Sequence, residues 1–344
     1  MRAVRVVENG RPLDVVEVRD VPVPDVEPGT VRVRVAAASL NFGDIARGRG
    51  GVASVLAQPP FTLGMDVCGV VDAAGDGAEA WVGRRVVALC AMSLGGMAEY
   101  AIAPVSGVFD APAELDDIEA AAFTLPFHTS YLALHQRAKL APQEHLLVVG
   151  GATAVGTAAI QLGVVAGAHV VATAGSAEKR ALCQKLGAEL AIDHTTDDVF
   201  DRVVEHTADH GADVALDMIG GAATETIWTC MAWEGRYVPV GFNDDPESGL
   251  TGRPLRKVSM GNFSVHGVML AYVDIPTAIR KFGVHPNPVE LGPRVHAALC
   301  DLVAGGRIRP VVGQVIGMSG VGAALEDHEQ RRTSGRTVVD LSLD

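Results

Sequence analysis

Apolar and charged side chains alternate in the first third of the chain. From Val31 to Val35 valines are interrupted by Arg32 and Arg34, a period of two that is typical of a strand with one buried face. Further apolar runs at 67–71 and 85–89 lie next to glycines. This part of the chain is therefore predicted to be a β-rich module.

The pattern changes near Glu119, where helix-forming residues begin. Apolar positions three and four residues apart predict a helix over 129–139. Beyond it, predicted strands and helices alternate. The strands are at 145–149, 169–173, 188–192, 214–217 and 235–240, and the helices are at 155–166 and 177–186. Such alternation predicts a doubly wound parallel sheet.

After about residue 265 the pattern becomes mixed again. It predicts a helix over 293–304 and closing strands at 310–316 and 337–341. A chain of 344 residues is too long for one comfortable hydrophobic core. We therefore expect two domains. One is formed by residues 1–122 and 265–344, and residues 123–264 form a second domain inserted into it.

Composition excludes several classes of function. A net charge of −13 disfavours the phosphate contacts that nucleic-acid binding requires. The sequence contains no uninterrupted apolar run of the roughly 18 residues that a membrane helix needs, and its first ten residues are too charged for a signal peptide. Five scattered cysteines fit reduced thiols and predict no structural disulfide. We expect a cytoplasmic protein that binds neither nucleic acid nor membranes.

The strongest local signal is a turn of small residues after the strand that ends at Val149. Gly151 and Gly156 take the first and last places of a G-x-G-x-x-G pattern, and Thr153 takes the middle one. Small residues there let backbone amides and a helix N-terminus approach a pyrophosphate. A tight turn without a ligand would use similar residues, but the βαβ context favours a dinucleotide site. We expect the cofactor to contact Gly151, Thr153, Ala154, Val155 and Gly156.

The end of the second strand of this unit distinguishes the two nicotinamide cofactors. A site that prefers NAD usually places an acid there to bind the ribose 2′-hydroxyl. This chain has no acid at that place, and Ser176, Lys179 and Arg180 follow it. A hydroxyl and two cations suit a 2′-phosphate, which predicts NADPH. The alternative is that Lys179 and Arg180 form an ordinary solvated helix face.

Several short motifs occur in a specific order along nearly the whole chain. They are 39–44, 60–66 with 69–71, 95–100, 150–156, 174–176, 186–188 and 217–221. With these motifs the chain resembles the zinc-independent, NADPH:quinone oxidoreductase-like branch of the medium-chain dehydrogenase/reductase superfamily. The resemblance implies an α/β fold in which a Rossmann domain, with its doubly wound parallel sheet, is inserted into a GroES-like β-rich catalytic domain. It also implies a homodimer formed largely through the Rossmann sheets.

The resemblance assigns roles to individual positions. Ser176 and Lys179 look like the family's contacts to the 2′-phosphate, and His194 stands where the family often has tyrosine. Further expected cofactor contacts are Gly241, Phe242 and Asn262. Asn41 and Thr129 match positions on the nicotinamide side, and the substrate is expected beside Asn41 and Met65.

The zinc-dependent branch holds its catalytic ion with a cysteine and a His–Glu pair. At the corresponding places this chain has Phe42 to Asp44 and Met65-Asp66, so no zinc is expected. Cys68 lies within an apolar strand and is predicted to be a small buried side chain. A nucleophilic Gly-x-Ser-x-Gly turn does not occur in the sequence either.

Without a Lewis acid, the chemistry that remains is hydride delivery to an acceptor that is already electron-poor. Quinones and activated α,β-unsaturated carbonyls meet this condition, and we expect a small apolar or conjugated carbonyl substrate. An enoyl-thioester reductase is an alternative, although Val52 stands where that group, and many quinone reductases as well, have a tyrosine. A non-catalytic scaffold or sensor that binds NADPH is the other alternative.

Overall fold

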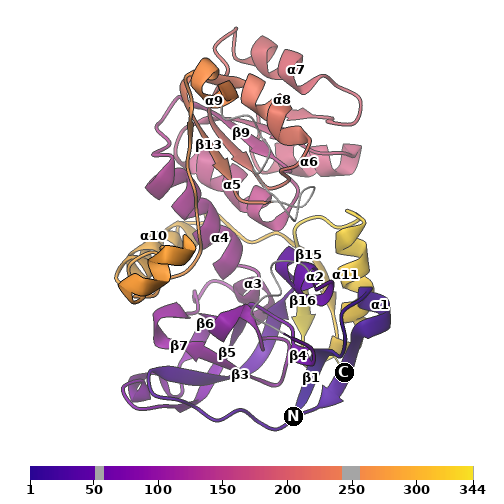
Figure 1. Cartoon of the computed structure of the whole chain (residues 1–344), viewed down its shortest axis with the longest axis vertical. Coiled ribbons are helices and arrows are strands. Elements are labelled where there is room, and N and C mark those ends of the chain that lie inside the picture. Colours follow the sequence, from indigo (N-terminus) through magenta and orange to yellow (C-terminus); the bar gives the residue numbers. More distant parts are fainter. Residues whose placement is uncertain (51–57, 242–255, 344) are drawn as a thin grey trace. The chain divides into compact units, whose positions relative to one another are not determined.

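The structure is a computed structural model that describes residues 1–50, 58–241 and 256–343. The chain divides into two compact units (Figure 1). The first unit comprises Met1–Leu125 and Ala271–Asp344, and the second comprises Pro126–Leu270.

Within its described residues, the first unit is built around a sheet of seven strands that joins both ends of the chain. Its order is β15-β16-β3-β5-β6-β8, with β7 also paired to β3. The strands are β3 (Thr30–Ser39), β5 (Asp66–Ala74), β6 (Arg85–Leu89), β7 (Tyr100–Pro104), β8 (Val108–Asp110), β15 (Val312–Ile316) and β16 (Arg336–Asp340). A smaller sheet contains β1 (Arg2–Val6), β2 (Val16–Asp20) and β4 (Phe61–Thr62). The predicted β-rich module is confirmed.

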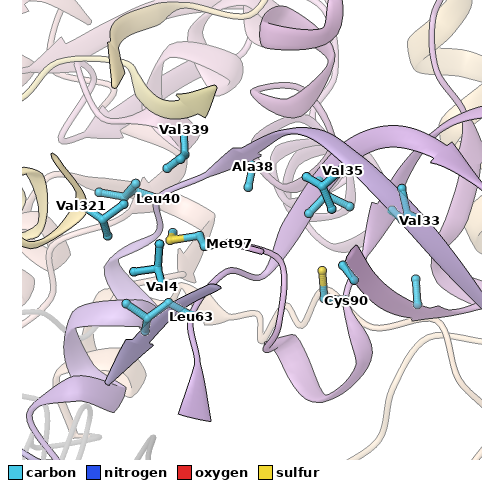
Figure 2. Packing of buried hydrophobic residues seen from close by; sticks show 14 of the residues in the cluster. Val4, Val33, Val35, Ala38, Leu40, Leu63, Cys90, Met97, Val321 and Val339 are labelled. Carbon is cyan, nitrogen blue, oxygen red and sulfur yellow. The ribbon is translucent and has the colours of Figure 1, made fainter. Parts of the chain in front are cut away.

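The alternation seen in the sequence explains the core of this unit. Val31, Val33 and Val35 point from β3 into the interior, while Arg34 on the same strand is exposed. Figure 2 shows this cluster, in which Leu40 packs near residues of the C-terminal segment such as Val339. Residues from opposite ends of the sequence therefore bury one shared apolar surface.

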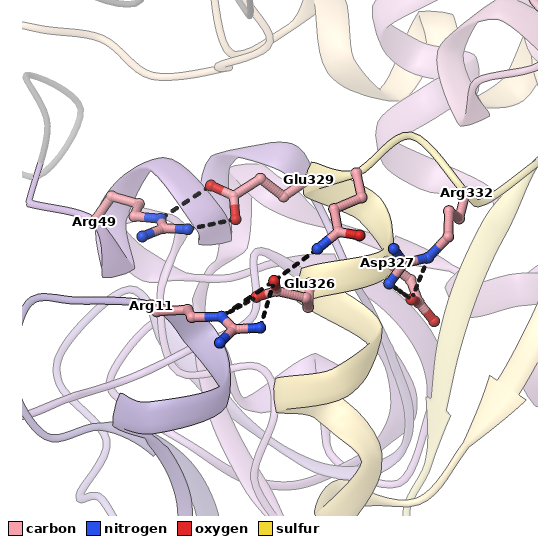
Figure 3. Close-up of polar contacts among 7 residues, drawn as sticks. Arg11, Arg49, Glu326, Asp327, Glu329 and Arg332 are labelled. Atoms are coloured by element: carbon pink, nitrogen blue, oxygen red, sulfur yellow. Dashed lines mark hydrogen bonds and ion pairs between the residues drawn. The ribbon is translucent and has the colours of Figure 1, made fainter.

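Short helices border the first unit. They are α1 (Pro12–Val15), α2 (Phe42–Gly48), α3 (Asp117–Ala121), α10 (Leu291–Ala304) and α11 (Val321–Glu329), with 3₁₀ turns at 79–81, 91–93, 105–107, 277–282 and 318–320. Ion pairs attach α11 to the residues that flank α1 and α2 (Figure 3). Arg11 donates to Glu326 at 2.9 Å and Arg49 donates to Glu329 at 2.5 Å. Such half-exposed pairs each contribute at most about 1 kcal/mol. The first connects α11 to the start of α1, and the second connects it to the end of α2.

The second unit contains a parallel sheet of six described strands in the order β11-β10-β9-β12-β13-β14. The strands are β9 (His145–Val149), β10 (His169–Thr173), β11 (Leu190–Ile192), β12 (Ala212–Asp217), β13 (Met231–Pro239) and β14 (Ser264–Val265). Counted from β9, this is the 3-2-1-4-5-6 order of a doubly wound dinucleotide-binding sheet, which confirms the predicted Rossmann topology. β10 and β11 are added on one side of β9, and β12 to β14 are added on its other side, so the order of the strands reverses between β9 and β12.

Helices connect these strands. They are α4 (Thr124–Tyr131), which continues into a π-helical turn at 132–137, α5 (Ala154–Val165), α6 (Ala177–Lys185), α7 (Val199–His206), α8 (Ala223–Thr229) and α9 (Arg256–Gly261). Residues Leu146 to Val149 of β9 are buried, as expected for the central strand of a parallel sheet covered on both faces.

All five cysteines are free thiols, and burial raises the pKa of Cys68 to about 12. The prediction of Cys68 as a small buried side chain is confirmed, because it is completely inaccessible to solvent. Across the described ranges, every helix is too short or too polar to cross a bilayer.

Candidate functional site

The turn that joins β9 to α5 has the geometry of an anion-binding cradle. Gly150 adopts a φ of +84°, which glycine tolerates best. Thr153 is the N-cap of α5: its hydroxyl accepts a hydrogen bond from the Gly156 N–H at 3.0 Å and donates to the Gly150 carbonyl at 2.8 Å. The threonine in the middle of the fingerprint therefore holds the turn together, and its predicted contact with the cofactor stays a prediction.

Two positions of this turn have no room for a side chain larger than that of glycine. A Cβ atom on Gly156 would lie 2.3 Å from the Gly150 carbonyl oxygen, and one on Gly151 would lie 2.8 Å from the Cys183 Sγ. The N–H groups of Ala154 and Val155 belong to the first turn of α5, where they cannot find acceptors within the helix. They and the helix dipole are available to an anion such as a pyrophosphate.

The turn lies opposite the loop that follows β12. A Cβ atom on Gly150 would lie 3.1 Å from the Ile219 Cδ1 atom. Asp217 organises this loop, because its Oδ1 atom accepts the N–H groups of Ile219 and Gly220 at 2.8 and 3.0 Å. The Tyr237 hydroxyl donates to the other oxygen of Asp217 at 2.7 Å. The carboxyl ends of β9 and β12 thus form the place where doubly wound sheets bind dinucleotides.

The residues expected at the 2′-phosphate lie together at the carboxyl ends of β10 and β11. Ser176 is the N-cap of α6, and its hydroxyl accepts the Lys179 N–H at 3.3 Å. The His194 ring lies against the residue before Ser176, since a Cβ atom on Gly175 would lie 3.0 Å from its Cε1 atom. Three positions that are up to 18 residues apart in sequence are therefore neighbours.

Arg180 has a partner that local sequence reasoning missed. Its guanidinium forms an ion pair with Asp193, which lies directly after β11. Hydrogen bonds from Thr195, and then the charge of Arg180, lower the pKa of Asp193, so the carboxylate stays ionised. A contact between Arg180 and a phosphate would have to compete with this pair. The feature of the sequence that could have indicated this pair is the acid at the end of β11, the third strand of the Rossmann sheet.

Two further residues expected at the cofactor, Gly241 and Thr129, lie near the turn. Gly241 lies at the carboxyl end of β13, where its N–H donates to the Asp217 carbonyl at 3.1 Å. Thr129 is buried on α4, next to Ser130, whose hydroxyl donates to the Val155 carbonyl at 3.0 Å. Both lie close to the elements that form the turn.

Asn262 is not brought to the turn by the structure. The Asn262 carbonyl accepts the Glu234 N–H at 2.9 Å, just before the pairing of β13 with β14 begins. Because these strands are parallel, Asn262 lies at their amino ends, opposite to the edge that carries the turn. Phe242 lies outside the described residues.

In the first unit, Asn41 is the N-cap of α2 and is almost completely buried. Its N–H donates to Asp44 Oδ2 at 2.9 Å, and the Gly64 N–H donates to Asp44 Oδ1 at 3.1 Å. Met65 lies beside this helix, since a Cβ atom on Gly43 would lie 3.1 Å from its sulfur. Asn41 and Met65 are therefore close neighbours, as the expected substrate position requires.

A buried ion pair adjoins Asn41. Arg336 Nη2 donates to both carboxylate oxygens of Asp66 at 2.7 and 2.8 Å, and their side chains are only 4 % and 1 % exposed. Asn41 Nδ2 donates to the same carboxylate at 3.0 Å. Burial raises the pKa of Asp66, whereas Arg336 and Asn41 lower it. Sequence reasoning did not identify Arg336, whose only signal was a cation at the edge of an apolar strand.

The described part of the chain contains no group of three or more histidine, cysteine, aspartate or glutamate side chains arranged to hold a metal ion. The residues at the expected zinc position instead carry two carboxyl groups: Asp66 is paired with the guanidinium of Arg336, and Asp44 accepts the backbone N–H groups of Asn41 and Gly64. A zinc-free site stays a prediction.

Asp44 is expected to make the stability of the protein depend on pH. Complete burial raises its pKa from 3.8 to about 6, against the two backbone N–H groups that lower it. Between pH 3.8 and about 6 the folded protein keeps the proton on Asp44, whereas the unfolded chain has lost it. The protonated carboxyl of Asp44 therefore contributes its full stability below pH 3.8, and this contribution is lost as the pH rises through about 6.

We therefore expect wild type to lose about 3 kcal/mol of unfolding free energy relative to Asp44→Asn between about pH 4 and about pH 7, since one pKa unit corresponds to about 1.4 kcal/mol. Urea unfolding of both proteins across this range measures the difference. A difference that is independent of pH would show that Asp44 does not titrate there.

Two protein families match the chain. Residues 27–113 match the family described as alcohol dehydrogenase GroES-like domain. Residues 154–283 match the family described as zinc-binding dehydrogenase. The first match falls in the β-rich unit, and the second begins at the first residue of α5.

Individual relatives match over almost the full length. A quinone oxidoreductase-like protein 2 homolog from Nematostella vectensis is 30% identical over 344 residues, covering 98% of this chain and 88% of its own. A mycobacterial structure complexed with NADPH has a TM-score of 0.86 and 26% identity, covering 98% of this chain and 99% of its own. The structure of an NAD-dependent alcohol dehydrogenase has a TM-score of 0.85 and 29% identity, covering 99% of this chain and 100% of its own.

Proposed function

Because this chain belongs to the quinone oxidoreductase-like branch of the medium-chain dehydrogenase/reductase superfamily, we propose that it is an NADPH-dependent reductase that delivers hydride to a quinone or an activated α,β-unsaturated carbonyl. The main support for the proposal is the glycine turn between β9 and α5, which lies where the strand order of the sheet reverses. The hydroxyl of Ser176 and the side chain of Lys179 follow the end of β10. The pyrophosphate would be held by the N–H groups of the first turn of α5.

The choice of NADPH over NADH is supported by the charges near the end of β10. Ser176 and Lys179 follow that strand, and no carboxylate stands at its end to bind a ribose 2′-hydroxyl. The nearest acid after β11 is Asp193, which is paired with Arg180 and does not act as a free negative charge. The mycobacterial relative in complex with NADPH supports this choice, whereas the NAD-dependent relative shows that the fold itself accommodates either cofactor.

Bound NADPH would supply the hydride, and the protein would contribute mainly position and shielding from water. We propose that Asn41 and Met65 border the substrate and that Thr129 lies on the nicotinamide side. The carboxylate of Asp66 is occupied by Arg336 and therefore does not act as a proton donor. An acceptor whose charge delocalises onto a conjugated oxygen suits such a site, and its proton can come from solvent.

A panel of substrates tests this proposal. NADPH oxidation should be rapid with menadione and with a conjugated enone, and slow with a crotonyl thioester and with a simple ketone. Faster turnover of the thioester would favour an enoyl-thioester reductase instead. Tight binding of NADPH with no oxidation by any of these compounds would favour a non-catalytic scaffold or sensor.

We also propose that two copies of the chain associate through the β14 edge of the Rossmann sheet. This edge strand is short and lies beside exposed apolar side chains, with Trp233 71 % and Met260 70 % exposed. A hollow of about 520 Å³ is lined by Trp233 and by Phe263 and Ser264 at β14. Among the described strands β14 is the last of its sheet, and exposed apolar groups next to such an edge are typical of an interface. Sedimentation of the Trp233→Glu variant should show a monomer where wild type sediments as a dimer, and equal sedimentation of the two proteins would contradict this.

The free, mostly buried cysteines fit a reducing compartment, and we propose the cytoplasm as the location. Disulfide-linked species in protein isolated from cells under alkylating conditions would contradict this assignment.

A further inference from the structure

The carboxamide of Asn41 is surrounded by groups that only accept hydrogen bonds. Its Nδ2 atom donates to the Ser39 carbonyl at 3.3 Å and to Asp66 Oδ1 at 3.0 Å. A carbonyl and a carboxylate have no proton to donate, so the nitrogen of the amide must face them. Both N–H groups of Asn41 are thereby used within the protein. Its Oδ1 atom faces the first turn of α2, where Asn41 and Asp44 form a capping box, and it is the only polar atom that this side chain can offer a ligand.

The Asp66 carboxylate makes the shorter of the two hydrogen bonds that fix this orientation, and it is held by Arg336 at the other end of the chain. The two side chains lie on β5 and β16, and both are almost completely buried. Arg336 Nε is buried with no hydrogen-bond partner among the described residues. Burying an unpaired N–H costs free energy, and a buried ion pair can often be replaced by apolar side chains without loss of stability. Stability alone therefore does not account for the pair.

We infer that Asp66 and Arg336 are positioning residues that fix Asn41 as a hydrogen-bond acceptor, so that the group it would bind is a donor, such as the amide N–H of a nicotinamide carboxamide, and not the carbonyl oxygen of the substrate. This inference rests on the proposed function, which places Asn41 at the reacting end of the site. It deepens that proposal, because Asn41 has no N–H left to stabilise negative charge on a substrate oxygen. The substrate must spread that charge over its own conjugated system, which excludes simple ketones.

The variant Asp66→Asn tests the inference. Its side chain can present either oxygen or nitrogen to Asn41, so the shorter of the two contacts that fix the Asn41 amide no longer imposes its orientation, and only the 3.3 Å contact with the Ser39 carbonyl remains. We expect kcat/KM for menadione, per folded molecule, to fall about 10- to 100-fold, since small displacements at a reacting centre have effects of this size. Affinity for 2′-phospho-ADP-ribose, which lacks the nicotinamide, should stay unchanged, whereas general loss of structure would weaken it as well.

Matched variants separate positioning from folding. Arg336→Lys keeps the cation and should retain kcat/KM within about threefold of wild type, whereas Arg336→Met should lose it as Asp66→Asn does. Asp72→Asn removes a half-buried ion pair with Arg32 at the other end of β5 and should leave kcat/KM unchanged. If Asp66→Asn does not fold, the two Arg336 variants decide the question.

Wild-type activity in folded Asp66→Asn, or equal activity of the lysine and methionine variants, would overturn the inference. Failure of wild type itself to oxidise NADPH would instead overturn the proposed function.

Discussion

Replacing Gly156 with alanine is expected to weaken NADPH binding by about 100-fold or more. The new Cβ atom would lie 2.3 Å from the Gly150 carbonyl and 2.8 Å from the Gly151 carbonyl. Both contacts are to backbone atoms of the turn, so the turn has to move away from α5. That movement separates the loop from the helix N-terminus, which together bind the pyrophosphate. Titration of intrinsic fluorescence with NADPH measures the change in Kd.

Gly267→Ala is the matched control for this substitution. It lies in the same unit, and a Cβ atom there meets nothing within 4 Å. We expect its Kd and its thermal midpoint to equal those of wild type. A folded Gly156→Ala variant with wild-type affinity would show that the turn does not hold the cofactor. Circular dichroism of each variant establishes that the comparison is between folded proteins.

Replacing Lys179 with glutamine is expected to lower the preference for NADPH over NADH by about 10- to 100-fold, which corresponds to the loss of one charge-assisted hydrogen bond. Lys179 lies in the first turn of α6, and its backbone N–H donates to the hydroxyl of the Ser176 cap. The substitution should lower kcat/KM for NADPH and leave kcat/KM for NADH nearly unaltered, because only NADPH carries the 2′-phosphate. The ratio of the two values does not depend on the fraction of folded protein.

Lys185→Gln removes the same charge from the last turn of the same helix and should leave the ratio unchanged. The preference of wild type should also weaken as salt concentration rises, because the interaction is partly exposed. Loss of activity with both cofactors in Lys179→Gln, at constant ratio, would contradict the assigned role. A preference of wild type for NADH would contradict it as well.

Most of the fold was predictable because it follows from short-range periodicity. Alternating valines indicated β3, and the alternation of apolar strands with helical segments indicated the Rossmann topology. The turn at 150–156 was also accessible, because steric demand for small residues is a local property. The role of Thr153 as a helix cap follows the general preference for hydroxyls at that position.

The interactions that escaped prediction join distant parts of the sequence. Arg336 and Asp66 are 270 positions apart, and nothing in the local pattern of either segment specifies that they pair. Arg180 looked like a free cation because Asp193 becomes its neighbour only through the parallel pairing of β10 with β11. Asn262 was expected at the cofactor, but the direction of β14 places it at the opposite end of the sheet. Strand direction and tertiary pairing set these contacts, and periodicity does not report them.

The central claim is that a site without zinc transfers hydride from NADPH to a conjugated carbonyl. Its most direct test is anaerobic oxidation of NADPH by menadione, using protein dialysed against a strong chelator and analysed for bound metal. We predict repeated turnover at an unchanged rate in protein that contains no zinc. Activity that disappears on chelation and returns with added zinc would contradict the claim, as would folded protein that does not oxidise NADPH.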